Sequence, residues 1–252
     1  VQVKGEPLNA PCNAAFSYAS AAYCTSGTDP VPTITGTAGG AFSSTAGLSI
    51  NASTGAINLA ASTPGTYVVT YATGAACSSP FNLTVTAPAV ASFSYPATEY
   101  CTSQSSTVPA TLGAGATAGT FTASVAGLTL DAATGTITPG SSTPGTYLIT
   151  NTVAAGGGCA AATSTFSVTI TAPAVADFSY PAATYCTSQS STVPVTLGAG
   201  STAGTYSSTT GLTLDATTGT ITPGSSTPGT YTITNTVAAS GGCAAATATF
   251  SV

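Results

Sequence analysis

The sequence predicts an all-β protein made of three tandem β-sandwich domains, and three observations support that prediction. The chain repeats one pattern about every 80 residues, its apolar residues recur at every second position, and Gly/Pro/Asp turn signals separate short apolar stretches. A period of two is typical of half-buried strands, whereas a helix buries every third or fourth residue. Regularly placed aromatic and β-branched residues disfavour the alternative of a disordered Thr/Ser/Gly-rich chain.

Three copies of the pattern divide the chain. The phrase Phe-Ser-Tyr begins each copy, and Pro-Gly-Thr-Tyr occurs late in each copy. A period near 80 residues is too long for a solenoid rung and suits one small domain per repeat. We predict domains at 12–88, 89–173 and 174–252, called here the first, second and third repeats, after an N-terminal segment 1–11. Short joints that contain Pro favour a semi-rigid chain of domains.

The third repeat shows the strand pattern clearly. Its alternating apolar positions predict about seven strands, near 178–181, 192–198, 204–208, 211–215, 219–222, 229–237 and 245–252. Seven short strands in about 80 residues indicate a two-sheet sandwich of the immunoglobulin type. Tyr231 starts the sixth strand, where such a sandwich places its tyrosine corner. Asn151 and Asn235 fall on the inward register, and a position beyond the packed part of the strand would explain them.

Charge excludes several classes of partner. Charged residues make up 3% of the chain, against roughly 25% in an average soluble protein. Lys4 is the only cation and the net charge is −5, which excludes an electrostatic nucleic-acid footprint and basic membrane-surface binding. No apolar run approaches the roughly 18 residues of a membrane span, so we expect no membrane insertion.

Groups that could perform chemistry are scarce. The chain has no His, and no Ser has a base beside it, so we predict no enzyme, no catalytic residue and no cofactor. Asp131 and Asp215 are the best calcium candidates, but the first repeat has Asn51 at the matching position. Turn capping explains all three residues, whereas calcium explains two, so we predict no metal site. Rows of Thr are also compatible with ice binding, but they are accounted for as the outer faces of strands.

The cysteines predict a disulfide framework. Each repeat has an early and a late cysteine, which suggests the pairs Cys24–Cys77, Cys101–Cys159 and Cys186–Cys243. Closing a loop of more than about fifty residues stabilises a domain by roughly 4 kcal/mol in the chain-entropy model. Such bridges imply an oxidising, extracellular location, whereas the alternative is three pairs of reduced core cysteines.

Cys12 is left over in this scheme. Ala89 and Ala174 take its place in the other joints. An odd cysteine in a secreted protein suggests a bond to another chain or a free thiol. An intermolecular thiol at Cys12 and an idle thiol are therefore the two hypotheses for this residue.

The repeat sequence also carries a resemblance. "GLTLDATTGTITPGSSTPGTYTITNT", from Gly211, resembles the immunoglobulin-like repeats of large bacterial surface proteins, and "YCTSQSSTVPVTLGAG", from Tyr185, is similar to repeats in giant adhesins of Bacteroidota. The match covers all three repeats, more loosely in the first. The resemblance implies an exported, cell-surface protein whose tandem domains form a stalk or filament, secreted through the type IX pathway.

The function predicted from these features is structural. We expect an extracellular, cell-surface array of repeats whose partners are copies of itself or further repeats of the same chain. Val1–Leu8 is strand-like and either finishes a preceding domain or adds to an open sheet edge of another subunit. The alternative is a binding module with a surface glycan or protein ligand, although the aromatic residues mostly fall in strand register, which favours core positions.

Overall fold

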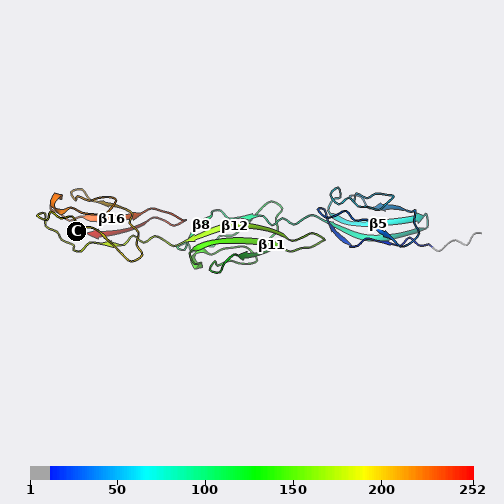
Figure 1. Ribbon diagram of the computed structural model, residues 1–252, viewed down its shortest axis with the longest axis horizontal. Helices are drawn as coiled ribbons and strands as arrows, with labels where there is room; N and C mark the ends of the chain where they lie inside the picture. The colour runs from blue at the N-terminus through cyan, green and yellow to red at the C-terminus, as the bar shows by residue number, and fades with distance from the viewer. Residues whose placement is uncertain (1–11) are drawn as a thin grey trace, which may run out of the picture. The chain divides into compact units, whose positions relative to one another are not determined.

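The computed structural model describes residues 12–252, and this part of the chain is all-β. Its elements are strands and two short 3₁₀ turns, η1 (Pro139–Ser141) and η2 (Pro223–Ser225), without an α-helix (Figure 1). The predicted fold class is therefore confirmed. The N-terminal segment 1–11, and with it the hypothesis about Val1–Leu8, lies outside the described residues.

Contacts between residues divide the described chain into two compact units. The first unit contains 12–92 together with 112–119 and 152–164, and the second contains 93–111, 120–151 and 165–252. A part of the second repeat thus belongs with the first repeat. The domain bounds 12–88, 89–173 and 174–252 remain a proposal.

The first repeat is built on a four-stranded sheet of order β2-β6-β5-β4. The long antiparallel pair is β5 (Gly65–Gly74) and β6 (Cys77–Thr86), flanked by β4 (Ala41–Ser44) and β2 (Ala22–Cys24). Tyr67, Val69 and Tyr71 point into the core while the residues between them face outward, because successive side chains of a strand alternate between faces. A small sheet of β1 (Phe16–Ser17) and β3 (Thr33–Ile34) adds to the fold, and Phe16 packs edge-on against Phe42.

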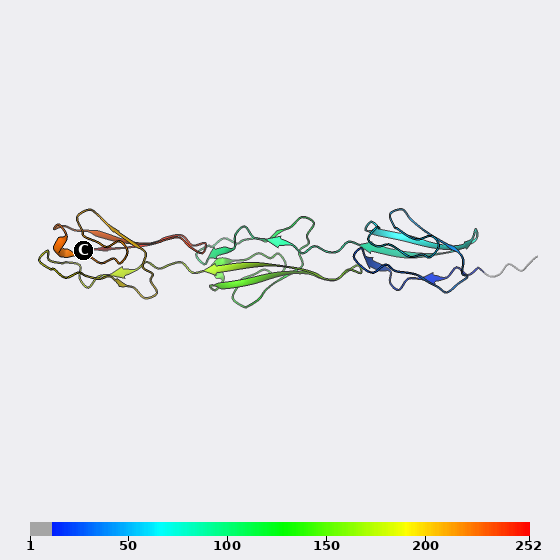
Figure 2. The ribbon, with the colours of Figure 1, turned by 45° about the horizontal axis from the view of Figure 1, so that its top comes forward.

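The second repeat uses the same order, β10-β11-β12-β8. Its strands are β7 (Phe93–Ser94), β8 (Glu99–Cys101), β9 (Thr111–Leu112), β10 (Thr120–Ala123), β11 (Gly145–Val153) and β12 (Ala162–Thr171). Figures 1 and 2 show β11 and β12 as neighbouring arrows. In both repeats the short cysteine-bearing strand, β2 or β8, runs parallel to the end of the last strand.

The third repeat has a smaller main sheet, β15-β16-β17. Its strands are β13 (Phe178–Ser179), β14 (Thr196–Leu197), β15 (Thr205–Ser208), β16 (Thr232–Val237) and β17 (Ala246–Ser251). The predicted strands 211–215 and 219–222 meet at a single bridge, Leu214 with Ile221. The segment that corresponds to β8 is not paired as a strand.

Two predicted details of the sandwich have different outcomes. The tyrosine corner is confirmed, because the Tyr231 hydroxyl donates to the Thr227 carbonyl at 2.7 Å. The suggestion that Asn151 and Asn235 lie beyond the packed strand is wrong, because both are 0% exposed. Asn235 donates its amide to the Ala176 carbonyl at 2.8 Å and accepts the Gly204 N–H at 2.8 Å, so a buried polar side chain is satisfied by backbone groups.

Candidate functional site

The candidate site is the set of disulfide-linked contacts between neighbouring repeats, called joints here. The first component of a joint is the end of a short cysteine-bearing strand, called the acceptor edge, and in the first repeat this strand is β2. Cys24 ends β2, whose residues align with the last three of β6, with Cys24 opposite Thr86. The Thr25 N–H donates to the Thr86 carbonyl at 2.9 Å and fixes this end. Cys24 is 4% exposed, so only a residue packed directly against this edge can contact its sulfur.

The second component is the tip of the β11–β12 hairpin, which belongs to the second repeat. Gly156 and Cys159 pair across the tip, and Gly157 and Gly158 between them have φ of +57° and +81°. A Cβ on Gly158 would lie 2.7 Å from the Ala22 carbonyl oxygen and 2.7 Å from the Tyr23 Cα. Glycine is therefore required twice here, for the left-handed backbone and for the close approach to β2.

A disulfide joins the two components. Cys24 and Cys159 are bonded with their Cα atoms 4.7 Å apart, and both lie in the first compact unit. Hence the early cysteine of the first repeat is linked to the late cysteine of the second.

The same joint recurs one repeat later, within the second unit. Cys101 at the end of β8 is bonded to Cys243, with Cα atoms 4.8 Å apart. A Cβ on Gly242 would lie 2.8 Å from the Glu99 carbonyl oxygen and 2.9 Å from the Tyr100 Cα. Two copies of one arrangement, with a Gly-Gly-Cys tip against a cysteine-bearing edge, indicate a repeated feature of the fold.

The predicted pairing within each repeat is wrong, and the sheet topology gives the reason. Cys77 begins the ten-residue strand β6, whereas Cys24 lies beside Thr86 at its other end. At about 3.3 Å per residue these ends are about 30 Å apart, far beyond disulfide reach. Cys101 and Cys159 stand at opposite ends of β12 in the same way, because β8 is parallel to that strand.

Cys12 and Cys186 also differ from the prediction. Cys12 is bonded to Cys77 with Cα atoms 5.4 Å apart, so the intermolecular and idle-thiol hypotheses for Cys12 are both wrong. Cys186, expected to pair with Cys243, is exposed and is the one cysteine of the described chain without a disulfide partner. The cysteines fit a staggered series in which Cys12 bonds Cys77 at the hairpin tip of the first repeat. The extra cysteine at the start of that repeat, Cys12, was the sequence signal for the stagger.

The surroundings of Cys186 favour a reactive thiol. Its sulfur lies 3.0 Å from the Ser188 hydroxyl, and hydrogen bonds from that hydroxyl and from the Ser188 backbone lower the pKa of the thiol. Exposure together with a lowered pKa raises the thiolate fraction, which is the nucleophile in disulfide chemistry. Cys24 and Cys101 have the same serine two residues later, at 3.3 and 3.1 Å.

Asp131, Asp215 and Asn51 act as turn caps, as predicted. Asp131 accepts the Ala133 and Thr134 N–H groups at 2.9 and 2.8 Å, and these hydrogen bonds lower the pKa of its carboxyl. Asp215 accepts two N–H groups at 2.8 Å in the third repeat, and the Asn51 amide oxygen accepts two at 2.9 and 3.0 Å in the first. Charge is thus not needed for this role.

Residues 12–252 are the part of the chain that the structure describes. This part of the chain contains no cluster of three or more His, Cys, Asp or Glu side chains that could hold a metal ion. Nor does it contain a helix of the length and apolarity required to cross a membrane.

Comparison with known proteins gives matches to solved structures. No family model matches the chain, and no curated protein matches it. Mouse cadherin-23 EC22–24 is 11% identical, with 95% of this chain and 98% of that chain covered and a TM-score of 0.32. Protocadherin gamma B2 domains 3–6 are 10% identical, with 94% and 72% covered and a TM-score of 0.31. The surface layer protein SbsC, domains 1–6, is 16% identical, with 97% and 40% covered and a TM-score of 0.28.

At these TM-scores the likeness says nothing about function. The resemblance to Bacteroidota adhesin repeats stays a prediction.

Proposed function

We propose that this protein is a non-catalytic, extracellular structural protein whose tandem immunoglobulin-like repeats build the stalk or filament of a cell-surface adhesin. The observation that carries the proposal is the pair of disulfides Cys24–Cys159 and Cys101–Cys243, each of which joins neighbouring repeats. A protein that only needed stable single domains would gain that from bonds within each repeat. Bonds between repeats instead add a second covalent link to the peptide backbone that already joins them.

Three disulfides support the extracellular location, because such bonds persist in oxidising compartments. The low charge supports assembly, since neighbouring copies or further repeats meet little electrostatic repulsion. The aromatic side chains that a glycan site would need exposed are largely core residues here, for example Phe42, Phe121 and Tyr206. The geometry therefore favours the scaffold over the glycan-binding alternative.

Electron microscopy of native cell-surface material, with and without a reducing agent, tests the proposal. We expect the protein in surface stalks or filaments labelled by an antibody to the repeats. Native protein found only as free monomers, or only inside the cell, would contradict it. A glycan array is the companion measurement, and strong specific binding there would favour the binding module.

A further inference from the structure

The last strand of each repeat begins at or just after a bonded cysteine. These last strands are β6, β12 and β17; Cys77 is the first residue of β6, whereas Cys159 and Cys243 stand three residues before β12 and β17. The bonds join Cys77 to Cys12, Cys159 to Cys24 and Cys243 to Cys101. A pull on any of these partner cysteines is therefore delivered to the start of a last strand.

The bond Cys12–Cys77 differs from the other two because both of its cysteines lie in the first repeat. It closes residues 13–76 into a loop, with a separation of 65 residues along the chain. Strands β1 to β5 lie in this loop together with most of the buried core of the repeat, for example Phe16, Phe42, Leu59, Tyr67, Val69 and Tyr71. Tension applied to the chain before Cys12 crosses one S–S bond to Cys77, so it does not have to extend the loop that holds the core.

The strand that receives this tension is already extended. β6 has ten residues, and a strand rises about 3.3 Å per residue against a limit of about 3.6 Å, so β6 can lengthen by only about 3 Å. It is also held on both sides, because its neighbours in the sheet are β5 and β2. The pairs with β5 run from Gly65 opposite Val85 to Ala72 opposite Ser78. While the bond Cys12–Cys77 is intact, the first repeat therefore has almost no length to release along this path.

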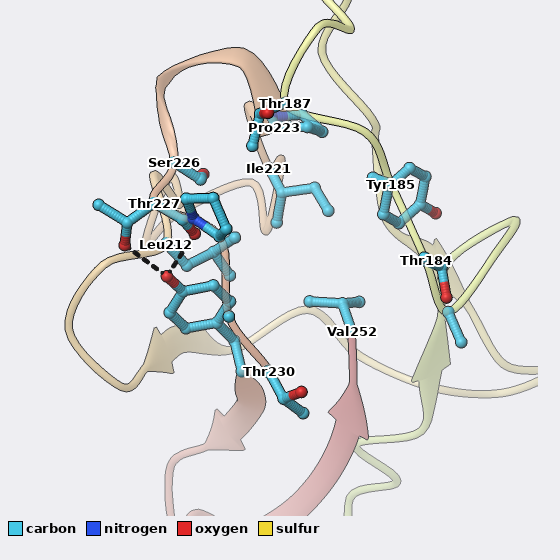
Figure 3. A pocket seen from close by; sticks show the side chains of 14 residues that line it. Thr184, Tyr185, Thr187, Leu212, Ile221, Pro223, Ser226, Thr227, Thr230 and Val252 are labelled. Atoms are coloured by element: carbon cyan, nitrogen blue, oxygen red, sulfur yellow. Dashed lines mark hydrogen bonds between the residues drawn. The ribbon is translucent and has the colours of Figure 1, made fainter.

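A tyrosine corner braces the end of β6 at which the tension leaves. Tyr67 stands near the start of β5, beside the end of β6, and its hydroxyl lies 2.8 Å from the Thr63 hydroxyl in the preceding turn. The third repeat has the same brace, because the dashed lines in Figure 3 mark the hydrogen bonds between Thr227 and the Tyr231 hydroxyl. Val252 lies at the end of the neighbouring strand there, and its carbonyl accepts the Tyr231 N–H at 2.8 Å. The partner strand is thus anchored where the last strand ends.

The bond Cys12–Cys77 is also the most accessible disulfide of the described chain. Cys12 is exposed and Cys77 is half-buried, whereas the four cysteines of the joints are between 2% and 7% exposed. The tip sequence explains the difference, because Ala75-Ala76 precede Cys77 where Gly157-Gly158 precede Cys159. A Cβ on Gly158 would lie 2.7 Å from the acceptor edge, so a tip with alanines does not fit into such a joint. Access controls the rate of thiol–disulfide exchange, and exposed disulfides are the labile ones.

We propose that Cys12–Cys77 is a redox-controlled mechanical lock. Oxidised, it carries tension past the core of the first repeat into β6; reduced, it places residues 13–76 under load while the joint disulfides stay closed. The shortest covalent path then runs through Cys24–Cys159 and is about 46 peptide steps longer, about 155 Å at roughly 3.4 Å per step. This inference rests on the proposed scaffold function and adds a regulated length to it.

The opening step is thiol–disulfide exchange with a dithiol. One thiolate of the dithiol attacks the Cys12 sulfur, the S–S bond breaks, and Cys77 leaves as a thiolate. The second thiol of the reductant then attacks its own sulfur in the mixed disulfide, which releases Cys12. Two electrons and two protons pass to the protein, and the dithiol becomes a cyclic disulfide.

Labelling kinetics test the redox part of the proposal. The folded full chain, carrying C186A to remove its free thiol, is incubated with dithiothreitol, alkylated at intervals and digested with chymotrypsin for mass spectrometry. We expect Cys12 and Cys77 to be alkylated at least tenfold faster than the joint cysteines. Equal rates, or faster opening of a joint, would overturn the proposal.

Force-clamp measurements test the mechanical part. The C186A chain, held by its two ends, is compared with the same chain carrying C12S and C77S and with a matched control carrying C24S and C159S. Both variants lack one disulfide, but only the first loses the shortest covalent path. We expect the C12S/C77S chain to gain about 155 Å more contour length on unfolding than the other two.

Reduction supplies the same comparison without a variant that has to fold. The C186A chain should gain the additional 155 Å or so when dithiothreitol is added at the concentration that opens Cys12–Cys77 alone. The same contour length in all three chains, or no gain on reduction, would refute the lock and leave filaments seen by microscopy as support for the scaffold. Native protein found only as monomers would refute the scaffold and leave the labelling rates unchanged.

Discussion

Pulling a single molecule from its two chain ends should reveal the staggered disulfides directly. With all three bonds intact, the shortest covalent path between the ends runs Val1–Cys12, Cys77–Cys101 and Cys243–Val252. This path has about 44 peptide steps and two disulfide crossings, so the fully extended chain measures about 160 Å at roughly 3.4 Å per step.

Reduction is the perturbation that releases the rest of the chain. Without disulfides the path follows all 252 residues, about 850 Å at the same rise. Reduction should therefore lengthen the fully unfolded molecule by about 700 Å. Atomic force microscopy or optical tweezers, with and without a small dithiol, measures this contour length.

The result also separates the two pairing schemes. Bonds inside each repeat, as first predicted, would leave a path of about 83 peptide steps and an oxidised length near 300 Å. A measured length near 300 Å would refute the joints described above, and so would a length that does not respond to reduction. The C186A variant is the matched control, because replacing a free thiol leaves the oxidised length at about 160 Å.

Three further predictions concern single residues. Gly158→Ala should slow reoxidation of the Cys24–Cys159 bond at least tenfold in a refolding assay, whereas the control Gly156→Ala, which meets no atom within 4 Å, should not. Tyr206→Phe should raise the free energy of unfolding by about 1–3 kcal/mol in chemical denaturation, because the buried Tyr206 hydroxyl is without a hydrogen-bond partner; a lower value would show that the hydroxyl is satisfied. Hydrogen bonds to the Asp215 carboxylate lower its pKa in the folded state, so the ionised side chain contributes to the stability of the fold. This contribution is fully present above the pKa of unfolded Asp and is lost as pH falls through the folded-state pKa. Asp215→Asn should therefore flatten the acid side of the stability–pH curve, and an unchanged curve would contradict the role of the charge.

The joint explains why glycine clusters at the hairpin tips. Gly157 and Gly241 each have φ of +57°, and a Cβ on either glycine would clash with the side chain of Thr86 or Thr171. The glycines that follow them lie against the backbone of the acceptor edge. Along the chain, Gly156–Gly158 is only a loop before a cysteine, but the contact surface that makes glycine necessary there belongs to another repeat.

Local patterns of the sequence determined the fold class, the repeats and the turns. Alternation along Tyr231, Ile233 and Asn235 is set by strand geometry within a few residues, and an Asp or Asn cap bonds two or three residues ahead. Such features need no knowledge of distant parts of the chain. The same holds for the tyrosine corner, whose partners are four residues apart.

Only the tertiary structure decided the cysteine pairing and the buried roles of Asn151 and Asn235. Whether Cys24 lies near Cys77 or about 30 Å from it depends on whether β2 runs parallel or antiparallel to β6, and spacing along the chain is the same in either case. Asn235 is satisfied by carbonyls 59 and 33 residues away, which no local pattern reveals. Sequence periodicity fixes which face of a strand is buried, but the direction of neighbouring strands fixes which ends of the chain meet.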